Sequence, residues 1–374
     1  GAWCLLVFAS VVGLTQPVLA GEAAAIDMEE AITRTLARNP TLVAFGYQIE
    51  IQQARLTQSQ LRPNPELGVL VENVFGSGEY EGADGAETTL SLGWVLERGK
   101  LEHRIAAARA GVSLFESEAE IQRLDVIAQT ARLFLVSLAN QEQLEREDVE
   151  HEVLTANYRL SAQWSQFEPD FSTVIGDPRQ LPKPAEFSSL LAQVDQNPSL
   201  SRFLTQKRLR EAELRLAESE AKPNWRVSAG IRRLELTDDN AFVMGIDIPL
   251  ATRNQNQGRI AEARAKIALA DANRTATRLQ IETQMFAVYQ ALQHSLHQTQ
   301  TLREEVLPRV EQALTDTQRA YELGRYDYSV LQLLQAEVLD TRTALVEASI
   351  EAHAHLIEIE RLTGTVMPSA VKQP

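Results

Sequence analysis

The stretch that decides the fold is 89–97, T-L-S-L-G-W-V-L-E, in which large apolar residues alternate with small or polar ones. Leu90, Leu92, Trp94 and Leu96 would share one face of an extended strand, opposite Thr89, Ser91, Gly93 and Glu97. The same alternation occurs in 225–232 and 241–250, and less cleanly in 66–75. Segments of about ten residues with one apolar and one polar face are typical of strands in membrane barrels. Half-buried strands of a soluble sheet alternate in the same way, so the strands alone leave both structures open.

The four segments come in two pairs because the chain repeats one plan. Asn39-Pro40 and Asn197-Pro198 each begin a helical run, and these runs end at Arg62-Pro63-Asn64 and Lys222-Pro223-Asn224. Two strand-like segments and a long helix follow each run, and the long helices open with the words IAAARA and IAEARA. Each of these words in the second half follows its counterpart in the first half at a nearly constant distance along the chain. A steady offset of this kind indicates an internal duplication. We predict a first repeat over 21–187 and a second over 188–374.

The helices favour the membrane barrel over a soluble sheet. From 258 to about 321 apolar residues keep helical spacing, with Pro308 as the one candidate break. At 1.5 Å per residue such a helix would extend roughly 95 Å. Alanine-rich helices of this length usually pack side by side as coiled coils. A returning helix is predicted from about Ser329, after a hairpin turn in which Gly324 supplies a positive φ.

The number of strands restricts how they can be used. Four strands are too few to close a barrel, and an open sheet edge cannot face lipid because its backbone groups would lack hydrogen-bond partners. Strands in lipid would therefore require several chains to share one barrel. The helices would then form a tube on one side of the membrane, with the short loops 76–86 and 236–240 on the other.

Composition excludes several classes of protein. The 374 residues include 36 Lys plus Arg and 51 Asp plus Glu, for a net charge of −15, so nucleic acid is not an expected partner. The single cysteine, Cys4, excludes an intramolecular disulfide framework and a cysteine-based zinc site.

Residues 2–14 are apolar and uncharged, and Val18 and Ala20 fit a cleavage site, which predicts a clipped signal peptide over 1–20. The alternative is a buried N-terminal helix.

At this point the chain resembles an outer-membrane factor of the TolC type, within the subgroup attached to cobalt–zinc–cadmium and copper resistance pumps. The words that carry the resemblance are ARNPTL, RPNPELGVLVEN, GIDIPLATRNQNQGRIAEARA and AYELGRYDYSVLQLLQAE, in that order. The resemblance implies a mainly α-helical fold in the cell outer membrane, with a small β part. It implies a homotrimer that completes a twelve-stranded barrel in outer-membrane lipid and a helical tunnel in the periplasm. The implied partners are a periplasmic membrane-fusion adaptor and an inner-membrane proton-driven pump.

The same resemblance implies a gate and exposes one departure. Family members close the periplasmic end of the tunnel near the hairpin turn, where Tyr321, Gly324, Arg325 and Asp327 lie in this sequence. A solvated hairpin tip explains the same residues without a gate.

The predicted helical region of the first repeat is 39 residues shorter than that of the second, and the missing stretch lies near His151. Whether such a tube seals and docks normally is left open.

Residues that could carry chemistry are few. No nucleophile elbow, phosphate-binding loop, dinucleotide fingerprint or HExxH motif occurs, and no enzyme activity or cofactor is expected. His294 and His297 share a helical face but have no carboxylate partner at helical spacing, so we expect no metal site, and His353 and His355 fall on different faces. Glu97 and Asp247 lie on polar strand faces and are candidate lumen residues, where negative charge would concentrate cations.

Three functions fit these observations to different degrees. The favoured function is a passive export duct for metal cations or other small solutes. An exported coiled-coil scaffold with a soluble sheet is the alternative, and a periplasmic metal-binding protein would depend on His294 and His297 alone.

Overall fold

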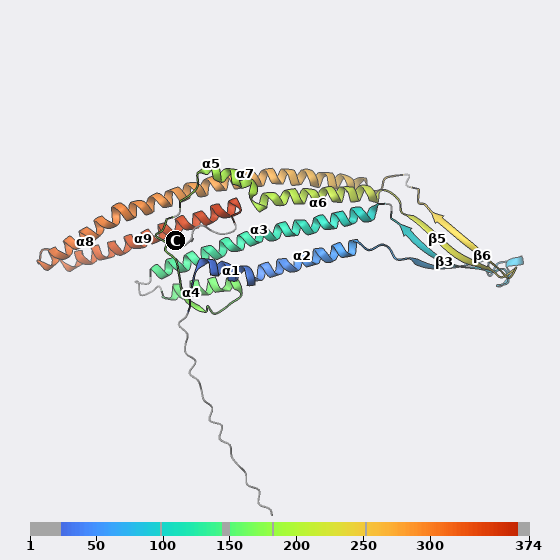
Figure 1. The fold of residues 1–374 in the computed structure, drawn as a ribbon, viewed down its shortest axis with the longest axis horizontal. Helices are drawn as coiled ribbons and strands as arrows, with labels where there is room; N and C mark the ends of the chain where they lie inside the picture. Colours follow the sequence, from blue (N-terminus) through green and yellow to red (C-terminus); the bar gives the residue numbers. More distant parts are fainter. Residues whose placement is uncertain (1–23, 98, 144–149, 182, 251–252, 366–374) are drawn as a thin grey trace, which may run out of the picture.

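The structure is a computed structural model that describes residues 24–97, 99–143, 150–181, 183–250 and 253–365. The predicted signal peptide lies outside the described residues. The molecule is elongated, with long helices along most of its length and a β-sheet at one end (Figure 1). This arrangement confirms the predicted fold class, which is mainly α-helical with a small β part. None of the helices in the described ranges combines the length and the apolar character that a bilayer crossing requires.

The four predicted strands form one antiparallel sheet. They are β2 (Glu66–Glu72), β3 (Glu87–Leu96), β5 (Trp225–Leu234) and β6 (Asp239–Asp247), in the order β2-β3-β5-β6. Two strands end three residues earlier than predicted. Strand β2 stops before Asn73 and Phe75, which both have positive φ angles. Strand β6 stops before Pro249, which has no N–H group to donate to a neighbouring strand.

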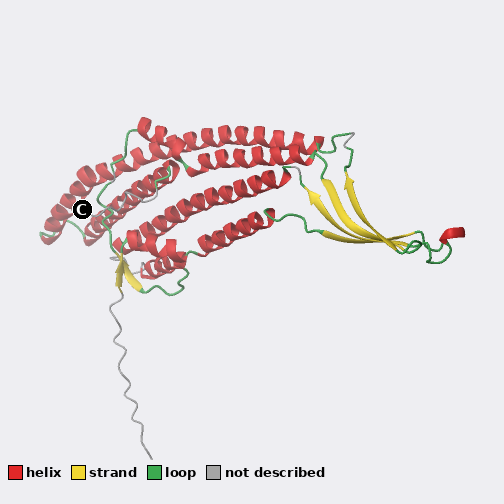
Figure 2. Ribbon diagram, turned by 45° about the vertical axis from the view of Figure 1, so that its right-hand side comes forward, coloured by secondary structure: helices red, strands yellow, loops and turns green. Residues whose placement is uncertain are grey.

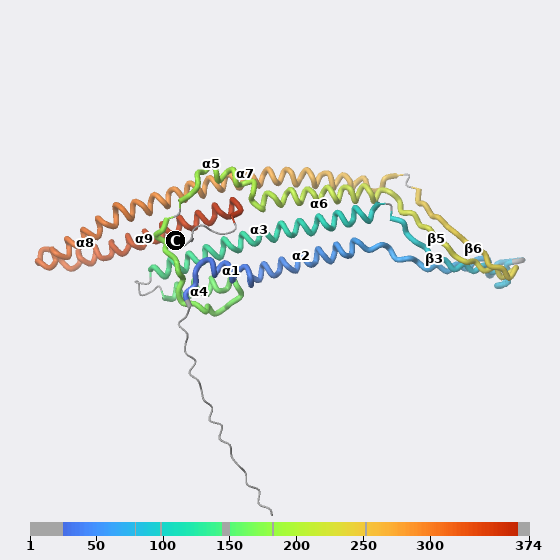
Figure 3. The backbone as a smooth tube through the Cα atoms, in the orientation of Figure 1, coloured from blue at the N-terminus to red at the C-terminus, as the bar shows by residue number. Residues whose placement is uncertain are grey.

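Four helices lie side by side in the same order as the strands to which they connect. Helices α2 (Pro40–Ser59), α3 (Lys100–Glu142), α6 (Pro198–Glu220) and α7 (Gln257–Thr301) pack as neighbours in that order (Figure 3). Each helix connects to a strand through a short segment at the same end of the molecule (Figure 2). The chain therefore forms a curved wall, one layer of helices continued by one layer of strands.

The second repeat contains a long helical hairpin. Helix α7 continues through a π-helical turn, Leu302–Val306, into α8 (Leu307–Glu322), and α9 (Tyr328–Thr363) returns beside it. Proline cannot donate an intrahelical hydrogen bond and clashes with the carbonyl of the fourth residue before it. The wider turn just before Pro308 relieves that clash. The helix therefore continues past Pro308, the residue at which a break was considered.

The first repeat has a much shorter return. After α3 the chain returns through α4 (Glu150–Ser161) and a 3₁₀ turn at Ala162–Trp164. Helix α4 has 12 residues, against 36 in α9. The α8–α9 hairpin consequently extends beyond the end of α3, at the left of Figure 1.

A second small sheet was not predicted. Strand β1 (Ala24–Ile26) pairs in parallel with β4 (Phe171–Val174) and joins the start of the described chain to the segment after α4. Helix α1 (Met28–Arg38) follows β1, and α5 (Phe187–Gln193) precedes a 3₁₀ turn at Val194–Gln196. A further 3₁₀ turn, Gly78–Tyr80, lies in the β2–β3 loop.

The core lies where the two return helices meet the helical wall. One buried cluster surrounds Phe134, Leu160 and Trp164, and a second surrounds Met285, Leu292 and Ile359. A polar network crosses the region between them. Glu358 of α9 accepts hydrogen bonds from Arg132 of α3 and from Gln284 of α7, and it also pairs with Arg361.

Candidate functional site

Most of the large apolar side chains of the four-stranded sheet lie on one face. Paired residues of neighbouring strands project to the same side. The register places Val69, Leu90, Ile231 and Phe242 in one row across the sheet, and Leu67, Leu92, Ala229 and Met244 in the next. Val69 is 65 % exposed, Phe242 70 % and Met244 75 %. An apolar surface this large and continuous requires a non-aqueous environment or a partner.

The opposite face is lined mainly by small and charged residues, with Leu70 and Val243 among the apolar exceptions. One row consists of Glu66, Gly93, Ser228 and Gly245, and the next contains Gly68, Ser91 and Gly230. Gly230 is required by close packing, because a Cβ atom there would lie 2.4 Å from the carbonyl oxygen of Leu90. The alternation read from the sequence thus becomes a sheet with one apolar and one polar face.

Ion pairs on the polar face link strands to one another. The Arg232 guanidinium contacts the carboxylates of Glu72 at 2.9 Å and Glu87 at 2.7 Å, which ties β5 to β2 and β3. Arg226 reaches across β3 to Glu66 at 3.0 Å. Gly93, the partner of Glu66 in β3, has no side chain to obstruct that contact. Each pair is partly exposed and contributes little alone, but together they hold the charges on the polar side.

Both edges of the sheet are open. Among the described residues, β2 is hydrogen-bonded only to β3, and β6 only to β5. The outer edge of each strand therefore presents backbone N–H and C=O groups that the sheet itself does not satisfy. In lipid, which offers no hydrogen-bond partners, these edges must pair with other strands.

The two candidate lumen residues have different surroundings. Asp247 is the last residue of β6, is exposed, and lies on the polar face opposite Arg226. Glu97 lies one residue beyond the end of β3, so its predicted place on the strand is wrong. Its carboxylate is 2.8 Å from Arg104 of α3. Arg104 also donates to the carbonyl oxygens of Ser59 and Leu61, so Glu97 belongs to the strand–helix junction.

The hairpin tip has the turn that Gly324 predicted. Gly324 has φ 67°, Arg325 N donates to Ala320 O, and Gly324 N donates to Tyr321 O. This pair of hydrogen bonds is the Schellman motif that ends many helices. Asp327 precedes α9, and its side chain makes no capping hydrogen bond. Tyr321 and Tyr328 are in ring contact across the turn, with centroids 5.9 Å apart.

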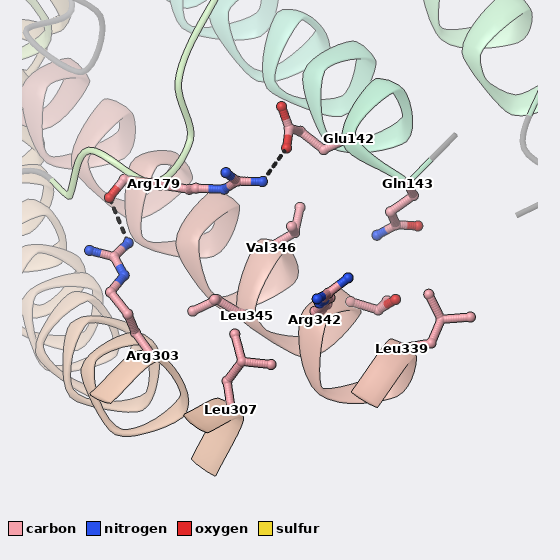
Figure 4. A pocket seen from close by; sticks show the side chains of 10 residues that line it. Glu142, Gln143, Arg179, Arg303, Leu307, Leu339, Arg342, Leu345 and Val346 are labelled. Atoms are coloured by element: carbon pink, nitrogen blue, oxygen red, sulfur yellow. Dashed lines mark hydrogen bonds and ion pairs between the residues drawn. The ribbon is translucent and has the colours of Figure 1, made fainter. Parts of the chain in front are cut away.

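A cleft of about 450 Å³ marks the point where α3 stops and the long hairpin continues (Figure 4). Arg179, in the segment after β4, donates to Glu142 at 3.1 Å, and its carbonyl accepts from Arg303 at 2.6 Å. Leu307 of α8 and Leu345 of α9 line the same cleft. The segment that joins the two repeats is thus clamped between the end of α3 and the π-helical turn.

The histidines form no metal cluster. His294 and His297 are both exposed on α7, and no group of three or more potential ligands occurs among the described residues. His353 is buried on α9, and its Nε2 lies 3.3 Å from the carbonyl oxygen of Pro178. His355 is half-buried and lies two residues further along the helix.

Comparison with known proteins agrees with this architecture. The chain is 24 % identical over 378 residues to the cobalt-zinc-cadmium resistance protein CzcC of Cupriavidus metallidurans, covering 89 % of this chain and 87 % of the relative. The Neisseria gonorrhoeae MtrE outer membrane channel superposes with a TM-score of 0.69 at 14 % identity, over 95 % of each chain. CusC, whose structures concern transmembrane channel formation, superposes with 0.68 at 14 % identity, over 90 % of this chain and 91 % of the other. No family model matches the sequence. The expected resemblance to TolC-type outer-membrane factors is confirmed.

Proposed function

We propose that this chain, which has the fold of the TolC-type outer-membrane channels, is the outer-membrane component of a tripartite efflux system. The observation that carries the proposal is the four-stranded sheet, with one exposed apolar face, one polar face and two open edges. A sheet with these properties is stable in lipid only when its edges are closed by other strands. The polar face would then line a water-filled passage.

We infer that three copies close the wall. The edges of the helical layer, together with the sheet edges, support the side-by-side assembly of several copies. Val43, Tyr47 and Ile51 form an exposed stripe along α2, and Leu269, Leu279 and Phe286 are exposed along α7. Joining α7 and β6 of one copy to α2 and β2 of the next would cover both the apolar stripes and the open backbone edges. Three copies would supply twelve strands and a continuous helical tunnel.

The proposed duct is passive and needs no catalytic residue. The relative CzcC is named a cobalt-zinc-cadmium resistance protein, and this name supports metal cations as the exported solutes. Solutes would enter from the periplasm, handed over by a membrane-fusion adaptor and an inner-membrane proton-driven pump. The adaptor would meet the hairpin tip, where Tyr321, Gly324, Arg325 and Asp327 would form the gate.

We also propose that 21–187 and 188–374 are two structural repeats, each made of a helix, two strands and a helical return. The unequal returns, α4 and α9, are the main difference between them.

The test asks whether the chain needs detergent to leave the membrane and what mass the extracted particle has. Membranes from expressing cells are washed with carbonate, and the pellet is extracted with detergent and analysed by multi-angle light scattering. We expect the chain to resist carbonate and to have the mass of a trimer after the detergent contribution is subtracted. A monomer that enters the aqueous wash without detergent would overturn the proposal and favour the exported coiled-coil scaffold.

A further inference from the structure

The charges around the sheet are distributed unequally between its two ends. The described residues of the four segments that join strands to helices, 55–65, 97–104, 220–226 and 247–259, contain eight basic and four acidic side chains. The basic ones are Arg55, Arg62, Lys100, Arg104, Lys222, Arg226, Arg253 and Arg259. At the opposite end, the strand termini and loops carry mainly acidic residues, among them Glu81, Asp84, Glu87, Glu235, Asp238 and Asp239. The basic end is an exception in a chain whose net charge is −15.

Part of this positive charge is not neutralised by ion pairs within the part of the chain that the structure describes. Arg104, Arg226 and Arg259 form ion pairs with Glu97, Glu66 and Glu220. The remaining five form no ion pair with any described residue. Arg55, Arg62, Lys222 and Arg253 are exposed, and Lys100 is half-buried. We call these five the basic collar.

The collar contains a concave surface as well as charge. Arg55 and Arg62 line a cavity of about 520 Å³ between the end of α2 and the start of α3, together with Leu61 and Pro63. Arg104 also lines this cavity, and it donates to the carbonyl oxygens of Ser59 and Leu61. A negatively charged group placed there would meet the guanidinium groups of Arg55 and Arg62 together with the apolar side chains of Leu61 and Pro63.

Two tryptophans place the collar relative to the membrane. Trp94 of β3 and Trp225 of β5 lie on the apolar face at the helix-side end of the sheet, in adjacent rows of the register. Tryptophan is enriched where a membrane protein crosses from hydrocarbon to headgroups. In each of the four segments one collar residue lies within six residues of a strand end, and Arg55 lines the same cavity as Arg62.

We propose that the basic collar binds the headgroup phosphates of anionic phospholipids in the adjoining leaflet. The inference depends on the proposed function, because it requires the sheet to lie in lipid. Clusters of Lys and Arg next to a membrane-embedded segment attract anionic headgroups, and the attraction decays within a Debye length. Bound lipid would fix the depth of the sheet in the membrane while leaving the polar face free for transport.

The experiment measures which lipid the purified protein retains. The detergent-solubilised full chain is mixed with equimolar phosphatidylglycerol and phosphatidylcholine, and bound lipids are counted by native mass spectrometry. The test variant combines Arg55→Gln, Arg62→Gln, Lys222→Gln and Arg253→Gln. The control combines Arg159→Gln, Arg208→Gln, Arg309→Gln and Arg319→Gln, four exposed residues on helices away from the sheet.

We expect the unmodified protein and the control to be enriched in phosphatidylglycerol. The enrichment should fall at least about fivefold in the collar variant, the factor that a single basic residue at a membrane surface provides, and it should also fall as salt is raised. Equal enrichment in the collar variant and the unmodified protein would overturn the inference.

Two further measurements separate the possible failures. Inorganic phosphate should reduce the enrichment no more than sodium chloride of equal ionic strength. A stronger, selective effect would identify a free-phosphate site and overturn the choice of lipid. Carbonate extraction of the same variants tests the proposed function independently. A chain that stays in the membrane and forms trimers without lipid preference contradicts the collar alone.

Discussion

Asn197 donates a hydrogen bond from Nδ2 to the carbonyl oxygen of Leu362 at 2.7 Å, which joins the start of α6 to the end of α9. Its Oδ1 simultaneously accepts from the backbone N–H of Ser199 and caps α6. Asn39 has the same two roles in the first half. It caps α2 and donates to the carbonyl of Gln163, at the end of the short return. One residue type therefore fixes the same joint in both halves.

The first prediction concerns this joint. Asn197→Ala removes the cap and leaves the Leu362 carbonyl without its partner, so we expect a loss of about 2 kcal/mol of unfolding free energy. Asn197→Asp keeps the capping oxygen but cannot donate, and we expect an intermediate loss. Urea unfolding in detergent measures both. Ser199→Ala is the control, because Ser199 contributes only its backbone N–H to this joint. Equal stability of Asn197→Ala and the control would contradict the assigned role.

The second prediction concerns the sheet at Gly230. The Cβ of Gly230→Ala would lie 2.4 Å from the Leu90 carbonyl, a contact with backbone that cannot rotate away. We expect the β3–β5 pairing to separate locally and the yield of folded oligomer to fall severalfold. Size-exclusion chromatography in detergent measures that yield. Gly258→Ala in α7 faces open space and favours a helix, so its yield should be unchanged or higher.

The third prediction distinguishes the two faces of β6. Met244 lies on the apolar face and Val243 on the polar face. A lysine near the middle of a lipid-facing strand costs about 2–4 kcal/mol. Met244→Lys should therefore destabilise the protein in lipid vesicles by about that amount, whereas Val243→Lys should change stability much less. Denaturant unfolding in vesicles measures the difference. Similar losses for the two variants would mean that lipid does not contact the apolar face.

The sheet and the long hairpin could be predicted because both depend on patterns that the sequence displays directly. Alternation with period two specifies which face of β3 and β6 is apolar, and helical spacing over many turns specifies α7 and α9. Gly324 marked the turn because few other residues adopt a positive φ without strain. These features need no knowledge of distant contacts.

The features that escaped prediction depend either on such distant contacts or on local details that periodicity does not show. Strands β1 and β4 have only three and four residues, too few to establish a period, and their pairing joins residues far apart in the sequence. The π-helical turn is a local response to Pro308 that allows the helix to continue. Alternation extended the predicted strand one residue too far, to Glu97, whose ion pair with Arg104 arises because α3 begins soon afterwards.

The fourth prediction concerns pH. Burial lowers the pKa of His353 below its ordinary value near 6.5, although the carbonyl of Pro178 and the charge of Asp177 act in the opposite direction. The folded protein therefore holds this imidazole neutral, while the unfolded chain takes up a proton more readily. Stability from this group is present above the ordinary pKa and is lost as pH falls towards the lowered one.

The measurement is the difference between the unmodified chain and His353→Gln, which removes the titration but keeps a polar side chain. Thermal unfolding at a series of pH values should show stability falling more steeply below pH 6.5 in the unmodified chain. Carboxylates titrate at lower pH in both proteins and cancel in the comparison. Parallel profiles for the two proteins would show that His353 does not contribute.

The fifth prediction concerns the preference of the proposed channel for cations, to which Asp247 and Glu97 should contribute unequally. Asp247 is exposed on the polar face, whereas the Glu97 carboxylate is held by Arg104. A carboxylate that is already paired adds little to the potential of a passage, but an exposed one attracts cations. Asp247→Asn should therefore reduce the preference for cations more than Glu97→Gln, and reversal potentials from single-channel recordings in a salt gradient measure this. A larger effect from Glu97→Gln would place that carboxylate, rather than Asp247, beside the ion path.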